Sequence, residues 1–498
     1  MNRDRAAARH AAIVAFVHDL VEVSLNRQLH APDKDFVQES LRRLIDSLHH
    51  CEELGVEMPL QLQLDDRMLH YDGLPLEGPS LQAAHLLRQC RDRGVAMLSF
   101  RPQLNVEEAN RAFDLLLLDH NRDALRREQR DQALKAFGIR NVGFTLNTPA
   151  DPTNRRSVYH LGDRTASAVH HYQDLAEALQ TNHMLAFRDL DLAIDEAAGV
   201  VERTLADFEE PSTLLALAAQ DDVDRFTVGH SVRVALLALQ VSRHLGLDRE
   251  QLISIGTAAL MHDIGKSKVP QEILFKRGHL DEEEWRMMSQ HPRLGAQLLL
   301  EQHASIDPCT IGAAFCHHMG PHGHGYPRPA LPILPSGTSH LIRVCDVFEA
   351  LTSVRPYKKA LTPLEAFAVM FRNPADFEPD WLRKFARTIG MFPTGTRVML
   401  DDGADGVVLA QSNDPSKPIV RLLAGADGTH LADNEPDRIV VGTEIAGKTR
   451  RIIAISTHDR VVDVPDFTAA PAPSTPHACL SEQLARDAQR VGAPKTAG

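Results

Sequence analysis

The sequence predicts a mainly α-helical protein, with a helical central domain, an α+β module before it and a small β subdomain after it. Three observations predict this class. Apolar residues recur at helical spacing through the centre of the chain, alternating and helical runs are mixed before residue 150, and alternating runs with Asp-Gly turns follow Pro393. A chain of 498 residues is long enough for two or three domains.

The first module is expected over residues 1–150. SLRRLIDSLHHC has helical spacing, whereas LQLQLDDRMLHYDG and GVAMLSFRP alternate as strands do. Its sequence contains no metal-ligand cluster, Gly-rich phosphate loop or nucleophile motif. Sensing, dimerisation of the chain or binding of a partner is therefore its expected role.

Three further segments flank the central domain, which is expected over residues 211–375. Residues 151–210 form an amphipathic, mostly charged helical run, which either transmits a signal or simply packs as a helix pair. Residues 376–463 alternate and turn at Asp-Gly pairs, which indicates a small β-rich subdomain. Residues 464–498 are rich in Ala, Pro and polar residues, which predicts a flexible tail with a short helix near Leu480 to Val491.

Seven side chains of the central domain are candidate metal ligands. Imidazole and carboxylate ligands suit iron, manganese or zinc, whereas a structural zinc site normally includes cysteine thiolates. Seven ligands are too many for one tetrahedral ion, and a carboxylate can bridge two ions. The set therefore predicts a dinuclear centre of the kind that cleaves phosphate esters. The candidates are His230, His262, Asp263, His291, His317, His318 and Asp346.

Local patterns predict that helices carry these ligands into the interior. In HSVRVALLALQVSRHLGL, an apolar stripe begins at Val234, one turn after His230, and Gly246 is a predicted helix stop. In DPCTIGAAFCHH, Asp307 is a predicted N-cap with proline after it, and the apolar stripe leads to His318. Both histidines are therefore expected to face inward.

Two more helices are predicted around the next ligands. LISIGTAALM is expected to deliver Asp263 and the histidine before it, with Gly265 ending the helical pattern. Asp281 and Glu284 form a predicted capping box that opens the helix DEEEWRMMSQ. The end of that helix is expected to deliver His291, just before a proline.

Each candidate ligand has a simpler interpretation when it is taken alone. A lone histidine such as His230 or His291 is more often a hydrogen-bonded core or surface residue, and one of His317 and His318 can be solvated. Asp346, inside LIRVCDVFEAL, can pair with an arginine, because a buried carboxylate is costly without a metal or a cation. Taken together, the ordered set followed by GYP and RPY patterns favours the metal interpretation.

From about Asp221 to Met370 the chain resembles the HD-GYP phosphodiesterases, a branch of the HD-domain metal-dependent phosphohydrolases. The motifs that carry the resemblance are HSVRV, HDIGKSKVP, HPRLG, HHMGPHGHGYP, DVFEALTS and RPYKK, in that order. They cover roughly a third of the chain, and their combination is specific, although a two-residue HD pair alone would be weak. The resemblance implies that the central domain is an HD-GYP helical bundle.

This family implies two divalent metal ions, iron or manganese by analogy. Asp263 would bridge the ions, water activated between them would attack the phosphorus, and Lys266 would assist at the phosphate. The alternative for Lys266 is a solvated lysine after a helix end. The implied ligands are His230, His262, Asp263 and Asp346 for one ion, and His291, His317 and His318 for the other.

The substrate that the resemblance implies is cyclic di-GMP. Arg355 and Lys358 would contact phosphate or guanine, because a guanidinium binds them with a planar fork and lysine supplies a point charge. Tyr357 would stack on a base. An ordinary helix-end turn with solvated charges remains the alternative for this group.

The residues Gly325, Tyr326 and Pro327 form the loop that gives the family part of its name. Glycine and proline fix a special backbone shape there, and tyrosine supplies an amphipathic anchor. In the family this loop is implicated in substrate access and in contact with diguanylate cyclase domains of the GGDEF type, so we expect a recognition loop. A rigid turn is the alternative.

The chain departs from the family pattern at three positions. Met319 and His322 replace the acidic residues of the usual HHE motif and of the aspartate before the glycine, which puts efficient turnover in doubt. His322 and His324 are either surface histidines or sources of protons or metal affinity near the site. Phe226 stands where trinuclear members carry glutamate, so two metals are expected, with linear pGpG as the main product.

Composition favours a cytoplasmic bacterial protein. The apolar runs are shorter than the ~18 residues that a membrane span needs, and we identify no signal peptide. The six cysteines lack zinc or disulfide spacing, which suits a reducing compartment. A net charge of −13 argues against general nucleic-acid binding, whereas a small anionic substrate needs only local positive charge.

Three functions are compatible with the sequence. The favoured one is a cyclic di-GMP phosphodiesterase. The second is a non-catalytic cyclic di-GMP receptor or GGDEF-binding scaffold, which the departure at Met319 makes credible. The third is an HD hydrolase of another cyclic dinucleotide or nucleotide, against which the GYP and RPYKK elements count.

Overall fold

The computed structural model describes most of the chain. The described residues are 2–65, 67–118, 121, 124–126, 129–146, 163–207, 227–274, 276, 279–302, 306–353, 360–412, 414–425, 438–442, 444–445, 448–456 and 461–463. Three predicted features lie outside these residues: Phe226, the RPYKK segment with Arg355, Tyr357 and Lys358, and the tail from residue 464.

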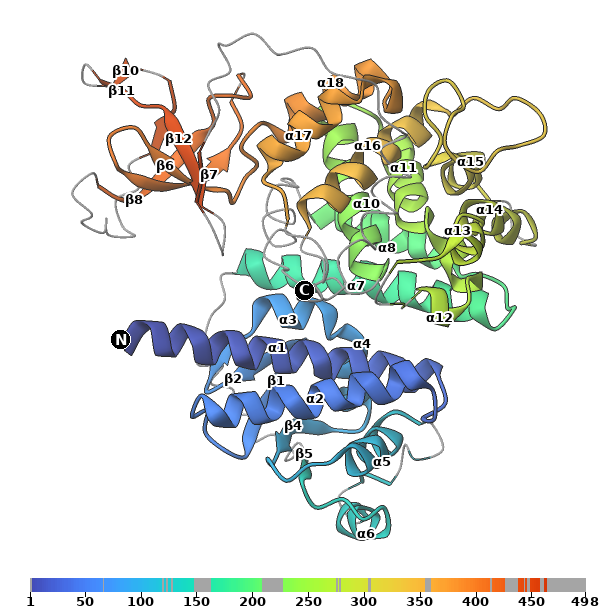
Figure 1. The fold of residues 1–498 in the computed structure, drawn as a ribbon, viewed down its shortest axis with the longest axis vertical. Coiled ribbons are helices and arrows are strands. Elements are labelled where there is room, and N and C mark those ends of the chain that lie inside the picture. Colours follow the sequence, from blue (N-terminus) through green and yellow to red (C-terminus); the bar gives the residue numbers. More distant parts are fainter. Residues whose placement is uncertain are drawn as a thin grey trace, which may run out of the picture. The chain divides into compact units, whose positions relative to one another are not determined.

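The chain divides into two compact units, Met1–Glu177 and Ala178–Gly498 (Figure 1). Helices dominate both units, and each also contains an antiparallel sheet. The predicted class, mainly α with an α+β module at the start and a β subdomain at the end, is confirmed. Within the described ranges, no helix has both the length and the apolar character that a bilayer crossing requires.

The first unit combines helices with a five-stranded sheet in the order β3-β2-β1-β4-β5. Its helices are α1 (Asn2–Leu29), α2 (Asp35–Glu53), α3 (Glu77–Gln82), α4 (Ala84–Asp92), α5 (Val106–Leu117) and α6 (Arg130–Ala136). Its strands are β1 (Leu60–Asp65), β2 (Met68–Tyr71), β3 (Leu74–Pro75), β4 (Val95–Phe100) and β5 (Val142–Leu146). Helix α7 (Asp163–Phe187) begins here and ends in the second unit.

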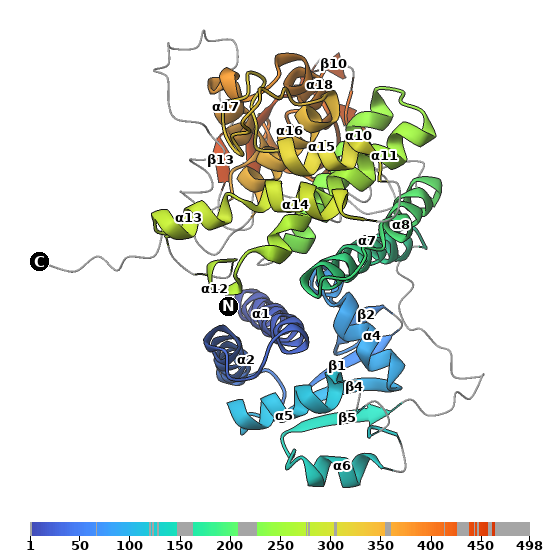
Figure 2. The same cartoon turned by 90° about the vertical axis from the view of Figure 1, so that its right-hand side faces the viewer.

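Alternation explains how this sheet contributes to one core. Leu60 and Leu62 point to the same face of β1 and are fully buried, as side chains two residues apart on a strand must share a face. They join a single apolar cluster with residues of α1, α2 and α5. Helices α1 and α2 lie side by side (Figure 2). The predicted strands and helix of this module are confirmed.

The second unit contains the helices of the central domain. They are α8 (Ile194–Asp207), α10 (Thr227–His244), α11 (Arg249–Met261), η2 (Ile264–Lys268), α12 (Gln271–Leu274), α13 (Glu282–Met288), α14 (His291–Leu300), α15 (Pro308–Cys316), α16 (Gly337–Thr352), α17 (Pro363–Arg372), η3 (Pro374–Asp376) and α18 (Pro379–Ile389). Helix α10 packs against α11 and α16, and α15 packs against α11, α14 and α16. These contacts bring the helices with candidate ligands together.

Capping residues set where several of these helices begin. The side chain of Asp281 accepts a hydrogen bond from the backbone N–H of Glu284, whose carboxylate in turn accepts from the backbone of Asp281. The side chain of Asp307 accepts from the backbone N–H of Cys309 at the start of α15. Both predicted caps are confirmed, and each satisfies backbone donors that a helix start leaves without a partner.

A six-stranded antiparallel sheet ends the described chain, in the order β13-β12-β6-β7-β8-β9. Val398 and Leu400 alternate with exposed or half-buried neighbours, and they pack with Leu364 of α17 in one apolar cluster. The strands are β6 (Arg397–Leu400), β7 (Asp405–Ala410), β8 (Ile419–Ala424), β9 (Arg438–Val440), β12 (Ile452–Ser456) and β13 (Val461–Asp463), with β10 (Glu444–Ile445) and β11 (Lys448–Thr449) pairing separately.

Two local predictions are wrong in detail. Gly265 does not end the helical pattern: α11 ends at Met261, and the chain continues as the tight turn of η2 with Gly265 inside it. His291 is the first residue of α14 rather than the end of the preceding helix, because α13 already ends at Met288. Proline suits the first turn of a helix, so the proline after His291 marks a start and not a stop.

Gly265 is required for another reason, which is a close approach between two backbones. A Cβ atom at Gly265 would lie 2.0 Å from the carbonyl oxygen of His291 and 2.4 Å from the backbone nitrogen of Gly295. We expect Gly265→Ala to lower the free energy of unfolding by about 3 kcal/mol, because backbone atoms cannot move aside as a flexible side chain can. Chemical denaturation measures this loss.

Gly312→Ala is the matched control for this substitution. Gly312 lies inside α15, and a Cβ atom there would have no neighbour within 4 Å among the described residues. Alanine should therefore be neutral or stabilise the protein by up to about 1 kcal/mol through helix propensity. Equal stabilities of the two variants would contradict the proposed backbone contact.

Candidate metal centre

The seven predicted ligands converge from five places in the fold and form two adjacent groups. His230 lies on α10, His262 and Asp263 follow α11, His291 opens α14, His317 and His318 follow α15, and Asp346 lies on α16. One group consists of His230, His262 and Asp346, and the other of Asp263, His291, His317 and His318. Within each group, the potential ligand atoms lie within 4.8 Å of one another.

Asp263 connects the two groups, because its two carboxylate oxygens face different histidines. Oδ1 lies 3.2 Å from Nε2 of His291 and 3.6 Å from Nε2 of His317. Oδ2 lies 3.4 Å from Nε2 of His262 and 3.8 Å from Nε2 of His230. A carboxylate in this position can bind one ion with each oxygen.

In three of the histidines, hydrogen bonds determine which ring nitrogen faces the centre. Nδ1 of His262 lies 2.7 Å from the carbonyl oxygen of Ala259, and Nδ1 of His291 lies 2.9 Å from that of Met288. Nδ1 of His317 also lies 3.0 Å from a carbonyl oxygen of α15. A carbonyl can only accept, so Nδ1 carries the proton and Nε2 keeps its lone pair for a metal.

Burial and charge give most of these groups the protonation states that metal binding needs. Burial lowers the pKa of His262 to about 4 and also lowers the pKa of His291 and His318. Burial alone would raise the pKa of Asp263, but the ammonium of Lys266 and the neighbouring imidazoles hold it well below its usual range. The result is neutral imidazole beside ionised carboxylate, which is the form of these ligands that binds metal.

His230 is the exception among the histidines. Burial opposes its protonation, but the carboxylates of Glu349 and Asp346 raise the pKa of His230 to about 9. In metal-free protein, the ring therefore keeps its proton below about pH 9, and an entering metal ion must displace that proton.

The affinity for metal should consequently rise with pH. We expect an increase of about tenfold per pH unit from neutrality up to about pH 9, and no further increase above it. Calorimetric titration with Mn²⁺ in buffers of different ionisation enthalpy measures both the affinity and the proton released. Affinity that does not change with pH would contradict a protonated His230.

The donor set fits divalent ions. Nε2 of His262, Oδ1 of Asp263 and Nδ1 of His318 are buried and have no hydrogen-bond partner within the described part of the chain. Buried polar atoms without partners are costly, and these three belong to the groups described above. Divalent metal ions would satisfy them, and nitrogen and oxygen ligands of this type suit iron or manganese.

Lys266 and the loop histidines occupy distinct places around this centre. Nζ of Lys266 lies 2.5 Å from Oδ2 of Asp263, so this lysine is not simply solvated. His322 is exposed, whereas Nε2 of His324 lies 3.2 Å from a carboxylate oxygen of Asp376. Neither loop histidine belongs to the two ligand groups. Met319, the residue after His318, is buried.

The loop of Gly325, Tyr326 and Pro327 packs directly on the candidate ligands. The ring of Tyr326 stacks on that of His318 with centroids 4.5 Å apart, and it contacts Trp285 edge to face. Tyr326 is only 9% exposed. Gly325 has a φ of +95°, and a Cβ atom there would lie 2.3 Å from the carbonyl oxygen of His318. In this structure the loop therefore packs against the candidate ligand His318, and its expected role in recognition stays a prediction.

The structure also places three residues at the centre that the sequence did not single out. Glu349 contacts Nδ1 of His230, and Arg233 contacts Glu349. His183 of α7 has a buried Nε2 atom without a partner in the described residues, and burial lowers its pKa to about 4, while the nearby charges of Asp263 and Lys266 act on it in opposite directions. An acidic residue in the apolar run DVFEAL was the available signal for Glu349, whereas nothing local in α7 marks His183.

Comparison with known proteins gives consistent results. A family model described as an HD domain matches residues 215–380. Over 291 residues the chain is 34% identical to a cyclic di-GMP phosphodiesterase of Pseudomonas aeruginosa, a match that covers 58% of this chain and 66% of that enzyme.

Two further relatives match a shorter part of the chain. A 3'3'-cGAMP-specific phosphodiesterase of Vibrio cholerae is 34% identical, over 34% of this chain and 36% of the relative. A cyclic di-GMP phosphodiesterase response regulator of Xanthomonas campestris is 36% identical, over 32% of this chain and 43% of the relative. The chain thus spans just under two thirds of the first relative and less than half of these two.

Proposed function

Because this chain belongs to the HD-GYP family of HD-domain phosphohydrolases, we propose that it hydrolyses the phosphodiester bond of cyclic di-GMP, with two divalent ions of iron or manganese. The relatives named for this activity support the substrate. We propose linear pGpG as the main product.

The observation that carries this proposal is the position of Asp263 between the two ligand groups. Each of its oxygens faces the imidazole nitrogens of a different group, at 3.2–3.8 Å. Bound divalent ions supply an activated water at neutral pH and neutralise charge on the phosphate. The carboxylate of Asp263 would hold the two ions at a fixed separation, and the neutral imidazoles would complete their coordination.

Lys266 would act on the substrate side of this centre. Its ammonium is 2.5 Å from Asp263 and is partly exposed, so it can turn from the carboxylate to a phosphate oxygen when an ion takes its place. Positive charge fixed near the phosphate stabilises a transition state in which negative charge develops. Arg355, Tyr357 and Lys358 are proposed to contact the phosphates and bases.

The cellular setting is part of the same proposal. A second-messenger hydrolase of this type would act in the cytoplasm, and its loop with Gly325, Tyr326 and Pro327 would contact substrate or GGDEF-domain proteins. The first unit would sense a signal or form a homodimer. Phe226, which stands where trinuclear members carry glutamate, supports two ions rather than three.

Product analysis tests the proposal directly. The full chain, purified without oxygen and loaded with Mn²⁺ or Fe²⁺, is incubated with cyclic di-GMP, and the products are separated by chromatography. We expect pGpG to accumulate, and a chelator to stop its formation. 3'3'-cGAMP serves as the competing substrate, because one relative is named for it. Binding of cyclic di-GMP without any product would favour the receptor function instead.

A further inference from the structure

Glu349 is a buried carboxylate that contacts a ligand of the metal centre. It lies on α16, one turn after Asp346, and is 3% exposed. Its oxygens accept hydrogen bonds from Nδ1 of His230, from the guanidinium of Arg233 and from the hydroxyl of Ser353. Nε and Nη2 of Arg233 lie 2.7 Å and 2.6 Å from Oε1 of Glu349.

Arg233 makes this burial possible. Removing a lone carboxylate from water is strongly unfavourable, and a paired guanidinium with hydrogen bonds in good geometry offsets much of that cost. Because the guanidinium contacts Oε1, the other oxygen, Oε2, is left to face the imidazole of His230. The carboxylate is therefore held in one orientation toward the ring.

The support of His230 differs in kind from that of three other histidine ligands. Nδ1 of His262, His291 and His317 donates to neutral backbone carbonyls, whereas Nδ1 of His230 donates to an ionised side chain. A carboxylate behind a metal-binding imidazole fixes the ring and raises its basicity more than a carbonyl does. In the described part of the centre, this anionic support belongs to one ligand group and not to the other.

We propose that Glu349 is a positioning residue that makes the group of His230, His262 and Asp346 the tighter of the two metal sites once an ion has displaced the proton of His230. This inference rests on the proposed dinuclear centre. Removing the negative charge should weaken metal binding at that group selectively, because the ligand that the carboxylate of Glu349 contacts, His230, belongs to that group.

Titration of metal-free full-length protein with Mn²⁺ tests the inference. Free Mn²⁺ is counted by its electron paramagnetic resonance signal, at one pH for all variants and without oxygen. Wild type should show two binding steps of unequal affinity. Glu349→Gln should weaken the tighter step by about 10- to 100-fold and leave the other unchanged.

Two variants separate charge from structure. Glu349→Asp keeps the carboxylate and should recover part of the lost affinity. Glu108→Gln is the matched control, because Glu108 is also a buried glutamate, which accepts hydrogen bonds from the backbone of Arg140 and Asn141, but it lies in the first unit and outside both ligand groups. It should preserve the order of the two steps, and thermal unfolding of every variant reports whether the fold is intact.

The outcomes are distinct. The role of Glu349 would be overturned if Glu349→Gln lowered the Mn²⁺ affinity of both steps equally, or of neither. It would also be overturned if Glu349→Asp bound Mn²⁺ as weakly as Glu349→Gln. Those results would leave the proposed hydrolysis intact. A wild-type protein that binds no Mn²⁺ would reject the metal centre itself, and the inference with it.

Discussion

Replacing His262 and Asp263 together by alanine is expected to reduce the proposed hydrolysis of cyclic di-GMP by at least about four orders of magnitude, or ~5.4 kcal/mol of transition-state stabilisation. The effect is large because the pair serves both ligand groups. Nε2 of His262 faces Oδ2 of Asp263, and Oδ1 of the same carboxylate faces the second group. Without the two side chains, neither ion keeps a full set of ligands.

Single-turnover kinetics with metal-saturated protein measures this loss, together with the number of Mn²⁺ ions bound at equilibrium. His244→Ala is the control, since His244 is an exposed histidine in the last turn of α10 and belongs to neither group. A surface change of this kind should alter stability by no more than ~0.5 kcal/mol and leave turnover as in wild type. Activity of the double variant within tenfold of wild type would contradict the proposed centre.

Local signals explain why much of this fold could be predicted. Capping residues such as Asp281 and Asp307 act on backbone groups within three residues, so their effect is visible in a short stretch of sequence. The stripe after His230 likewise reports which face of α10 is buried. The order of the imidazoles and carboxylates, followed by the GYP and RPY patterns, indicated that they would converge, and the structure brings all seven together.

Contacts between distant segments could not be predicted in this way. Gly265 was expected to end a helix, but its true constraint is the backbone of α14, which the local pattern does not contain. Glu349 pairs with His230 across 119 positions of the sequence. An acidic residue inside an apolar helix does indicate a buried partner, but its identity depends on how α10 and α16 pack.

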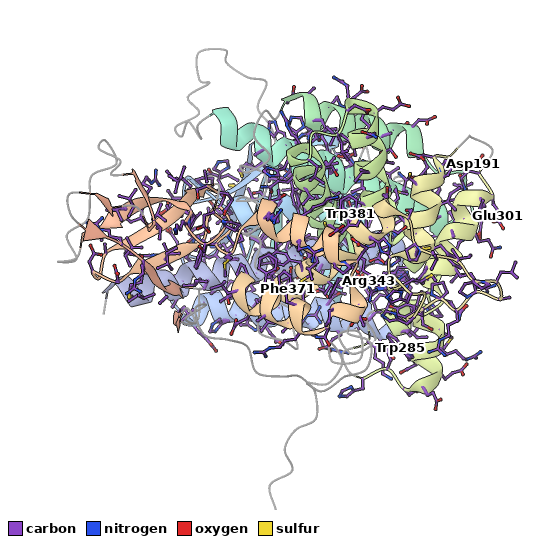
Figure 3. The ribbon with its side chains drawn as sticks, turned by 90° about the horizontal axis from the view of Figure 1, so that it is seen from above. Asp191, Trp285, Glu301, Arg343, Phe371 and Trp381 are labelled. Atoms are coloured by element: carbon purple, nitrogen blue, oxygen red, sulfur yellow. The ribbon has the colours of Figure 1, made fainter. Side chains whose placement is uncertain are left out.

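The second large effect is expected on stability. Arg343 of α16, which is labelled in Figure 3, is 1% exposed. It is the largest fully buried side chain among the described residues. Its Nε donates to the backbone carbonyl of Asp376 at 2.6 Å, Nη2 lies 3.2 Å from the Asp376 carboxylate, and Nη1 lies 3.4 Å from the carbonyl oxygen of His317. One guanidinium thus joins α16, η3 and the end of α15, where the candidate ligand His317 lies.

We expect Arg343→Met to lower the free energy of unfolding by about 3–5 kcal/mol, because it leaves the buried carboxylate of Asp376 without its cation. Chemical denaturation measures the change. Arg383→Met is the matched control: Arg383 pairs with Asp380 on the surface of α18, and an exposed pair is worth at most about 1 kcal/mol.

A double variant separates the charge from the packing. Arg343→Met with Asp376→Leu removes both partners of the buried pair, and apolar side chains of similar volume often replace such a pair without loss. Stability should therefore recover in part, whereas the hydrogen bond to the carbonyl of His317 stays lost. If the single and double variants were equally unstable, the volume of Arg343 rather than its charge would hold this junction together.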